Sequence, residues 1–148
     1  MRAPIILLVE DTPSDVALTL DALRRAHVAN EVVVVRDGAA ALDYLFARNA
    51  WAGRDTTELP QVMLLDLNLP QVSGLQVLRA IRDDPRTRAV PVIILTSSRE
   101  DQDILEGYSL GANSYIVKPV DFDQFAEAVR ALGLYWVVLN QPDGGEID

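Results

Sequence analysis

Short apolar segments alternate along this chain with segments in which apolar residues recur at every third or fourth position. Runs of about four or five apolar residues, bounded by polar or turn-forming residues, are typical of strands buried on both faces of a sheet. Five segments fit this pattern and are predicted to be strands, namely residues 5–9, 31–35, 62–66, 92–95 and 114–117.

Helical periodicity fills most of the sequence between these strands. Five helices are predicted, over about residues 12–26, 39–48, 75–84, 100–110 and 121–132. Thr12 is a favourable N-cap residue with Pro13 at the first helical position, and Asp121 is predicted to cap the last helix. In that last helix, the residues spaced to face the core are Phe122, Phe125, Val129 and Leu132.

The order of these elements predicts the fold class. Strands that alternate with helices indicate an α/β fold, in which an open, doubly wound parallel sheet of five strands carries helices on both faces. Residues 49–60 show no clear period and are predicted to form a surface loop. In such sheets, ligands bind beyond the carboxyl ends of the strands, so that edge is where we expect the chemistry.

Composition and charge narrow the class of protein. The 148 residues suit one domain with a sizeable core, and the absence of cysteine excludes disulfides and thiolate metal sites. A formal net charge of -9 argues against general nucleic-acid binding. The apolar runs are too short to span a bilayer, and no secretion signal precedes the first strand. We therefore expect a cytoplasmic protein that binds neither nucleic acid nor membrane.

Polar side chains follow four of the predicted strands. Glu10 and Asp11 end the first strand, Asp66 ends the third, Thr96 ends the fourth and Lys118 ends the fifth. Because the carboxyl ends of parallel strands meet at one edge of a sheet, these side chains are expected to converge. Three carboxylates repel one another unless a cation lies between them, and Mg²⁺ prefers oxygen ligands. The pattern therefore predicts a magnesium site.

The same residues suggest phosphoryl chemistry at Asp66. A carboxylate can act as a nucleophile toward phosphorus if the phosphoryl oxygens are neutralised. We expect Mg²⁺, the Lys118 ammonium and the Thr96 hydroxyl to contact one phosphoryl oxygen each. The backbone carbonyl of Asn68 lies two residues beyond the acceptor, where it can complete the metal shell. The bond before Pro119 is a candidate cis peptide, although the sequence alone leaves the trans form open.

These features together resemble a known family. The chain is similar to the receiver (response-regulator) domains of two-component signalling, which share the flavodoxin-like fold of the chemotaxis regulators. The resemblance covers about residues 4–132, with residues 133–148 as an extension and tail. The matching motifs are ILLVED at 6–11, LLDLNLP at 64–70, SG at 73–74, ILTS at 94–97 and GANSYIVKP at 111–119.

The resemblance carries implications for topology, partner and mode of action. It implies the strand order 2-1-3-4-5 and a cis peptide bond between Lys118 and Pro119. It also implies that a histidine kinase donates the phosphoryl group. A receiver of this kind catalyses its own phosphorylation and slow dephosphorylation but is not a turnover enzyme. Only 16 residues follow Leu132, so the expected output is protein contacts or onward relay of the phosphoryl group.

The resemblance also assigns roles to individual residues. It implies that Asp66 is the phosphoacceptor, that Asp11 is a direct metal ligand and that Glu10 acts on the metal through water. Thr96 and Tyr115 are implied to form the switch: the threonine moves to the phosphoryl group, and the tyrosine turns inward into the space that it leaves.

Two segments depart from a minimal receiver. The 49–60 loop is long, and the apolar segment 134–139 continues past the expected end of the last helix. These features resemble the stand-alone receivers that serve phytochrome-type, light-sensing histidine kinases. The tail would expose apolar surface on a monomer. We therefore expect a symmetric homodimer through the last two helices, the fifth strand and the tail.

Two other classes of protein share part of this pattern of strand-end residues. A phosphatase of the haloacid-dehalogenase type also uses a strand-end aspartate, Mg²⁺ and a lysine, but it needs an aspartate where this chain has Asn68. A receiver-like scaffold that no longer accepts phosphate would be favoured if an acidic residue or Lys118 were missing, and none is. The sequence therefore favours the switch.

Overall fold

The computed structural model describes residues 5–26, 28, 30–97 and 106–132. They form one five-stranded parallel sheet in the order β2-β1-β3-β4-β5, which confirms the predicted fold and strand order. The strands are β1 (Ile5–Val9), β2 (Glu31–Val35), β3 (Val62–Asp66), β4 (Val92–Thr96) and β5 (Ser114–Val117).

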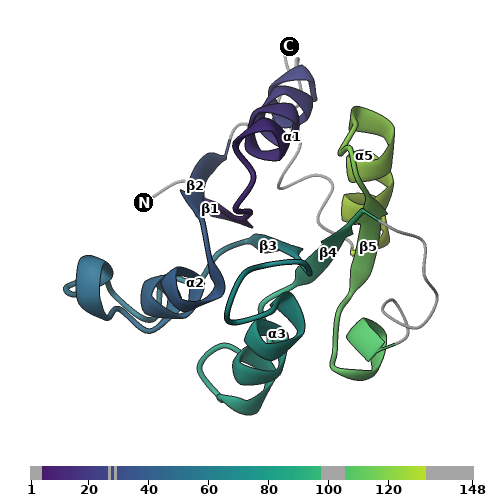
Figure 1. The fold of residues 1–148 in the computed structure, drawn as a ribbon. Coiled ribbons are helices and arrows are strands. Elements are labelled where there is room, and N and C mark those ends of the chain that lie inside the picture. The colour runs from purple at the N-terminus through teal and green to yellow at the C-terminus, as the bar shows by residue number, and fades with distance from the viewer. Residues whose placement is uncertain (1–4, 27, 29, 98–105, 133–148) are drawn as a thin grey trace, which may run out of the picture.

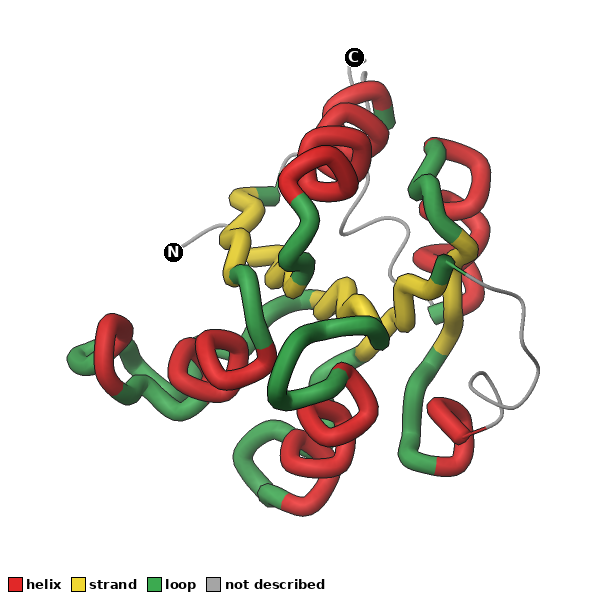
Figure 2. Tube along the Cα trace, viewed as in Figure 1, coloured by secondary structure: helices red, strands yellow, loops and turns green. Residues whose placement is uncertain are grey.

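Helices cover both faces of this sheet (Figures 1 and 2). Helices α1 (Pro13–Arg25) and α5 (Phe122–Ala131) lie on one face, whereas α2 (Gly38–Leu45) and α3 (Gly74–Asp83) lie on the other. Each face has its own apolar core, because alternate residues of a strand point to opposite sides. The three inner strands β1, β3 and β4 are buried along their whole length.

Three of the described helices begin at a residue whose side chain caps the helix N-terminus. Asp37 accepts a hydrogen bond from the Ala40 amide at the start of α2, and Asp121 accepts one from the Gln124 amide at the start of α5, as predicted. Ser73 forms a reciprocal capping box at α3. Thr12 occupies the N-cap position of α1, but its side chain makes no capping hydrogen bond.

The connection after α2 differs from the prediction in detail. The helix ends at Leu45 rather than at residue 48, because Ala47 and Asn49 adopt positive φ angles of 55° and 52°. A short 3-10 helix, η1 (Asn49–Trp51), follows within the predicted loop. The Arg54 guanidinium then donates hydrogen bonds to the carbonyls of Tyr44 and Glu58, which ties the loop to α2.

One predicted core residue is exposed. The Phe122 side chain is 47% exposed, which corrects the expectation that it faces the core. It is the first residue of α5, and the buried contacts of that helix begin one turn later, at Phe125.

Part of the predicted helix 100–110 is described, since residues 106–109 are helical. Residues 100–105 of that prediction and the tail from residue 133 lie outside the described part of the chain. Among the described residues, no helix combines the length and apolar character needed to cross a membrane.

Candidate functional site

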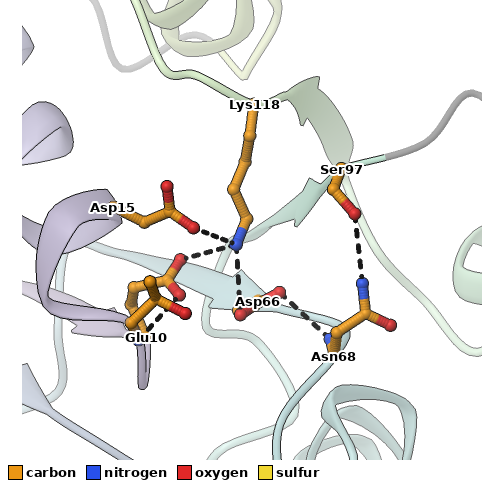
Figure 3. A network of polar contacts seen from close by, with 7 residues as sticks. Glu10, Asp15, Asp66, Asn68, Ser97 and Lys118 are labelled. Carbon is orange, nitrogen blue, oxygen red and sulfur yellow. Dashed lines mark hydrogen bonds and ion pairs between the residues drawn. The ribbon is translucent and has the colours of Figure 1, made fainter.

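The predicted acidic residues meet at the carboxyl edge of the sheet. Glu10 directly follows β1, and Asp66 is the last residue of β3, the central strand. Both carboxylates are buried. Figure 3 shows the Lys118 ammonium joined by dashed lines to Glu10, Asp66 and Asp15, with Asp15 on the same side of the lysine as Glu10. The sheet topology therefore brings these groups together as expected.

This cluster has the oxygen donors that a divalent cation needs. Glu10, Asp11 and Asp66 each offer one carboxylate oxygen, and the three oxygens lie within 4.8 Å of one another. Oε1 of Glu10 is buried and lies 3.0 Å from the Lys118 ammonium, in an ion pair that lacks hydrogen-bond geometry among the residues described. A buried oxygen of this kind is a ready ligand, so the residues fit a hard cation such as Mg²⁺.

Lys118 is held by three carboxylates at once. Its ammonium nitrogen lies 3.0 Å from Oε1 of Glu10, 3.1 Å from Oδ2 of Asp15 and 3.2 Å from Oδ2 of Asp66. Burial by itself would lower the pKa of Lys118, but the surrounding carboxylates outweigh it, and the pKa is raised. The lysine therefore stays protonated, and its charge is directed at the acidic cluster.

The pKa of Glu10 is raised by this arrangement. Its side chain is fully buried, and burial raises its pKa to about 7, with the Asp66 carboxylate adding to the rise and Lys118 opposing it. A group of this kind gains from any cation that enters the site, because the cation favours the charged carboxylate.

Asn68 borders the cluster on the side of β4. Its backbone amide donates to Oδ1 of Asp66 at 3.0 Å, and its side-chain amide donates to the Ser97 hydroxyl at 3.4 Å. The contact with Ser97 holds the loop after β3 against the loop after β4 (Figure 3). One Asp66 oxygen thus accepts a backbone N–H and the other faces Lys118.

The two predicted switch residues lie in different environments. Thr96 is buried at the end of β4, and its backbone carbonyl accepts a hydrogen bond from the Lys118 amide at 2.7 Å. Tyr115 is 40% exposed on the edge strand β5, where its ring meets that of Tyr108 edge-on at 6.2 Å. The tyrosine therefore faces outward, away from the acidic cluster.

The turn that presents Lys118 is held by a residue that sequence reasoning missed. The Lys118–Pro119 peptide bond is cis. The side chain of Gln124 accepts a hydrogen bond from the Val117 amide and donates to the carbonyls of Val117 and Pro119. Its position three residues after the Asp121 cap was the only signal in the sequence.

Gly74 allows α3 to start against the acceptor strand. A Cβ atom at this position would overlap the carbonyl oxygen of Asp66 and lie 2.7 Å from the Leu67 Cα. The Gly74 amide also donates to the Leu67 carbonyl at 3.2 Å. The SG motif therefore has a physical reason, which is the close approach of the two backbones beside the site.

Asp15 is the second residue that sequence reasoning did not place in the site. In the sequence it is an acid in the first turn of the first helix, a position that favours the helix N-terminus. That turn directly follows β1 and Asp11, which could have suggested that Asp15 lies at the same edge of the sheet. Its contact with Lys118 spans 103 positions of the chain, and no local pattern encodes it.

The fold and the acidic cluster indicate a class of protein. A comparison with known families identifies that class. The family model for the response regulator receiver domain matches residues 6–130. The chain therefore belongs to the receiver-domain family of two-component response regulators.

Several relatives within this family are similar over most of the chain. The probable methanogenesis regulatory protein FilR2 of Methanothrix harundinacea is 41% identical over 95% of this chain and 88% of its own length. Response regulator Rcp1 of Synechocystis is 32% identical over 90% and 88%. Its Mn²⁺-bound structure has a TM-score of 0.75, covering 93% of this chain and 99% of Rcp1.

A solved structure points to a narrower group. The bacteriophytochrome response regulator RtBRR is 51% identical to this chain, with a TM-score of 0.85 over 95% of this chain and 84% of RtBRR. The chain is thus related to the response regulators of phytochromes.

Proposed function

We propose that this protein is a phosphoacceptor switch that takes a phosphoryl group onto Asp66 from a histidine kinase. The observation that carries the proposal is the geometry of Asp66 itself. Its carboxylate is buried at the end of the central strand, 3.2 Å from a lysine ammonium and beside two further acidic residues. An aspartate is almost never fully buried unless its charge is paired, and here the paired charges leave oxygens that a cation and a phosphoryl group can use.

The chain's own groups would act on the phosphoryl group as follows. A carboxylate oxygen of Asp66 forms the new bond to phosphorus while the bond from phosphorus to the donor's imidazole nitrogen breaks. The imidazole leaves with that electron pair. The Lys118 ammonium neutralises one phosphoryl oxygen, and the Thr96 hydroxyl donates to another.

A divalent cation completes the proposed site. Asp11 and Asp66 would bind Mg²⁺ directly, the Asn68 backbone carbonyl would add a further oxygen, and Glu10 would act through water. When bound, the cation supplies positive charge to the phosphoryl oxygens. The Mn²⁺ of Rcp1 supports this part of the proposal, since that relative binds a divalent ion.

The Asn68 side chain supports a switch rather than a phosphatase. A carboxamide does not ionise near neutral pH, so it cannot act as the acid/base that a haloacid-dehalogenase mechanism needs two residues after the nucleophile. Hydrolysis of the acyl phosphate is therefore expected to be slow.

The output is proposed to pass through Thr96 and Tyr115. When the Thr96 hydroxyl moves to the phosphoryl group, the space behind it becomes available, and Tyr115 turns from its outward position into that space. We infer that the surface around β5 and α5 then changes its contacts, including those of a homodimer. The similarity to RtBRR supports a phytochrome-type kinase as the donor.

Mass spectrometry with a small phosphodonor tests the acceptor. Acetyl phosphate and Mg²⁺ should add one phosphoryl group, mapped to Asp66, as acetate leaves. Asp66→Asn should prevent the addition, whereas Asp83→Asn, which neutralises an exposed acid at the far end of α3, should not. An unchanged mass of the parent protein, or labelling elsewhere in Asp66→Asn, would refute the assignment. Phosphotransfer profiling against purified kinases would then identify the donor.

A further inference from the structure

Three carboxylates surround the Lys118 ammonium, and of these contacts the one with Asp15 has the geometry of a hydrogen bond. An ammonium group has three N–H donors, and three carboxylates lie at nearly equal distances of 3.0, 3.1 and 3.2 Å from its nitrogen. A phosphoryl oxygen that approaches this ammonium therefore competes with the three carboxylates. The question is which of Glu10, Asp15 and Asp66 gives way.

Burial distinguishes the three carboxylates. The side chains of Glu10 and Asp66 are 0% and 2% exposed, whereas that of Asp15 is 29% exposed. A carboxylate that already touches solvent can be rehydrated at lower cost than a buried one. Asp66 carries the phosphoryl group in any case, so it stays beside the lysine. Asp15 is thus the partner that Lys118 can release most easily.

We propose that Asp15 is a positioning residue that holds Lys118 in the unphosphorylated protein and gives it up when Asp66 is phosphorylated. The inference rests on the proposed function. Asp15 acts against phosphorylation in two ways: it competes for the ammonium, and its negative charge repels the incoming anion. The acid on the first turn of α1 thereby sets how readily the switch turns on.

Neutral and conservative variants of Asp15 test this role. Asp15→Asn keeps the shape but removes the charge, and Asp15→Glu keeps a carboxylate that can reach Lys118. Two quantities are measured at saturating Mg²⁺: the phosphorylation rate with acetyl phosphate and the affinity for beryllofluoride, which mimics a phosphoryl group. Asp15→Asn should raise both by about threefold, the size expected for a partly exposed ion pair. Asp15→Glu should stay near the parent.

A control separates this effect from a change in net charge. Asp83→Asn makes the same charge change at the C-terminal end of α3, away from Lys118, and should leave both quantities at the parent value. A folding defect cannot imitate the expected result. Loss of an acid from the first turn of α1 lowers helix stability, whereas the predicted rate and affinity rise.

The possible outcomes separate the inference from the proposed function. If the parent protein is phosphorylated and Asp15→Asn is slower or unchanged, the role of Asp15 is wrong and the proposed function stands. An equal increase in Asp83→Asn would likewise overturn it, because net charge would then explain the gain. If the parent accepts no phosphoryl group and binds no beryllofluoride, the proposed function fails and the inference fails with it.

Discussion

At the scale of single residues, the site carries more negative charge than its one lysine can neutralise. Glu10, Asp15 and Asp66 surround the one ammonium group of Lys118, and Asp11 lies beside Glu10 and Asp66. One positive charge offsets one of four negative charges, and two of those carboxylates are buried. The arrangement therefore favours ligands that add positive charge, and a divalent cation does so most effectively.

Removing Asp11 should weaken Mg²⁺ binding more than any other single change at the acidic cluster. A direct carboxylate ligand supplies both an oxygen and a negative charge. Since loss of even an outer-shell partner typically costs about 10–100-fold in metal affinity, Asp11→Ala should reduce it at least about tenfold. Calorimetric titration measures this, with Asp83→Asn as the control. Parent-like binding by Asp11→Ala would contradict the ligand assignment.

Glu10 should make the metal-free protein less stable as the pH rises. Its pKa is about 7 in the folded state, against 4.5 as the ordinary value. Between these values the folded protein binds more protons than the unfolded chain, so the free energy of unfolding falls with increasing pH. The loss should be on the order of 2–3 kcal/mol when complete.

Urea unfolding in EDTA from about pH 4.5 to 8 measures this effect. In Glu10→Gln the free energy of unfolding should depend less on pH between about 4.5 and 7 than it does in the parent. Saturating Mg²⁺ should flatten it in the parent too, because the cation favours the charged carboxylate. If the parent and Glu10→Gln show the same slope in EDTA, the pKa of Glu10 is not raised by burial.

At the scale of elements, two backbones and one arginine position the site. Helix α3 starts against the end of β3 because Gly74 has no side chain. At the other end of the helix, Arg82 donates hydrogen bonds to the carbonyls of Val90 and Gly111 and to the Asn113 side chain. These contacts tie α3 to the segments that lead into β4 and β5, the strands that end in Thr96 and precede Lys118.

Gly74→Ala should therefore disturb both stability and metal binding. Alanine favours a helix more than glycine does, but here its Cβ would overlap the Asp66 carbonyl and the Leu67 Cα. We expect a loss of about 1–3 kcal/mol in the free energy of unfolding, typical of overpacking, together with weaker Mg²⁺ binding.

Gly107→Ala is the matched control for this prediction. A Cβ there would overlap the end of the Ile94 side chain and touch Ala112 Cβ at 4.0 Å, so the clash is with a side-chain end and not with the backbone. Urea unfolding and Mg²⁺ titration of both variants separate a local clash from general helix effects. Equal losses of stability and equal Mg²⁺ affinities in the two variants would show that Gly74 has no special role beside the site.

At the scale of the whole molecule, exposed aromatic side chains lie on β5, at the start of α5 and in the helical segment before β5. Tyr108, Tyr115 and Phe122 are 42%, 40% and 47% exposed. The apolar segment 134–139 follows α5 in the sequence and lies outside the described residues. Exposed aromatic residues suit a contact between copies of the chain.

The full-length chain should form a homodimer, and phosphorylation should change its dissociation constant because Tyr115 is one of these exposed aromatic residues. Analytical ultracentrifugation with and without acetyl phosphate measures both effects. A chain that ends at Leu132 should dimerise more weakly, since it lacks the apolar tail. A full-length protein that stays monomeric at tens of micromolar under both conditions would rule out the dimer.

The sequence by itself determined the architecture and most of the site. Alternating apolar runs and helical periods specify strands and helices through local physics. The polar residue at each strand end then falls at one edge, because the strands are parallel. Glu10, Asp11, Asp66 and Lys118 were predictable in this way, and Thr96 was placed at the end of its strand by the same argument.

Only the tertiary structure decided which partners these residues have and how deeply they are buried. The contact of Lys118 with Asp15 spans 103 positions, and that of Arg82 with Gly111 spans 29. The exposure of Phe122 and the full burial of Glu10 depend on where each element ends against its neighbours. Local periodicity carries no information on such distances, because they arise only when the helices pack on the sheet.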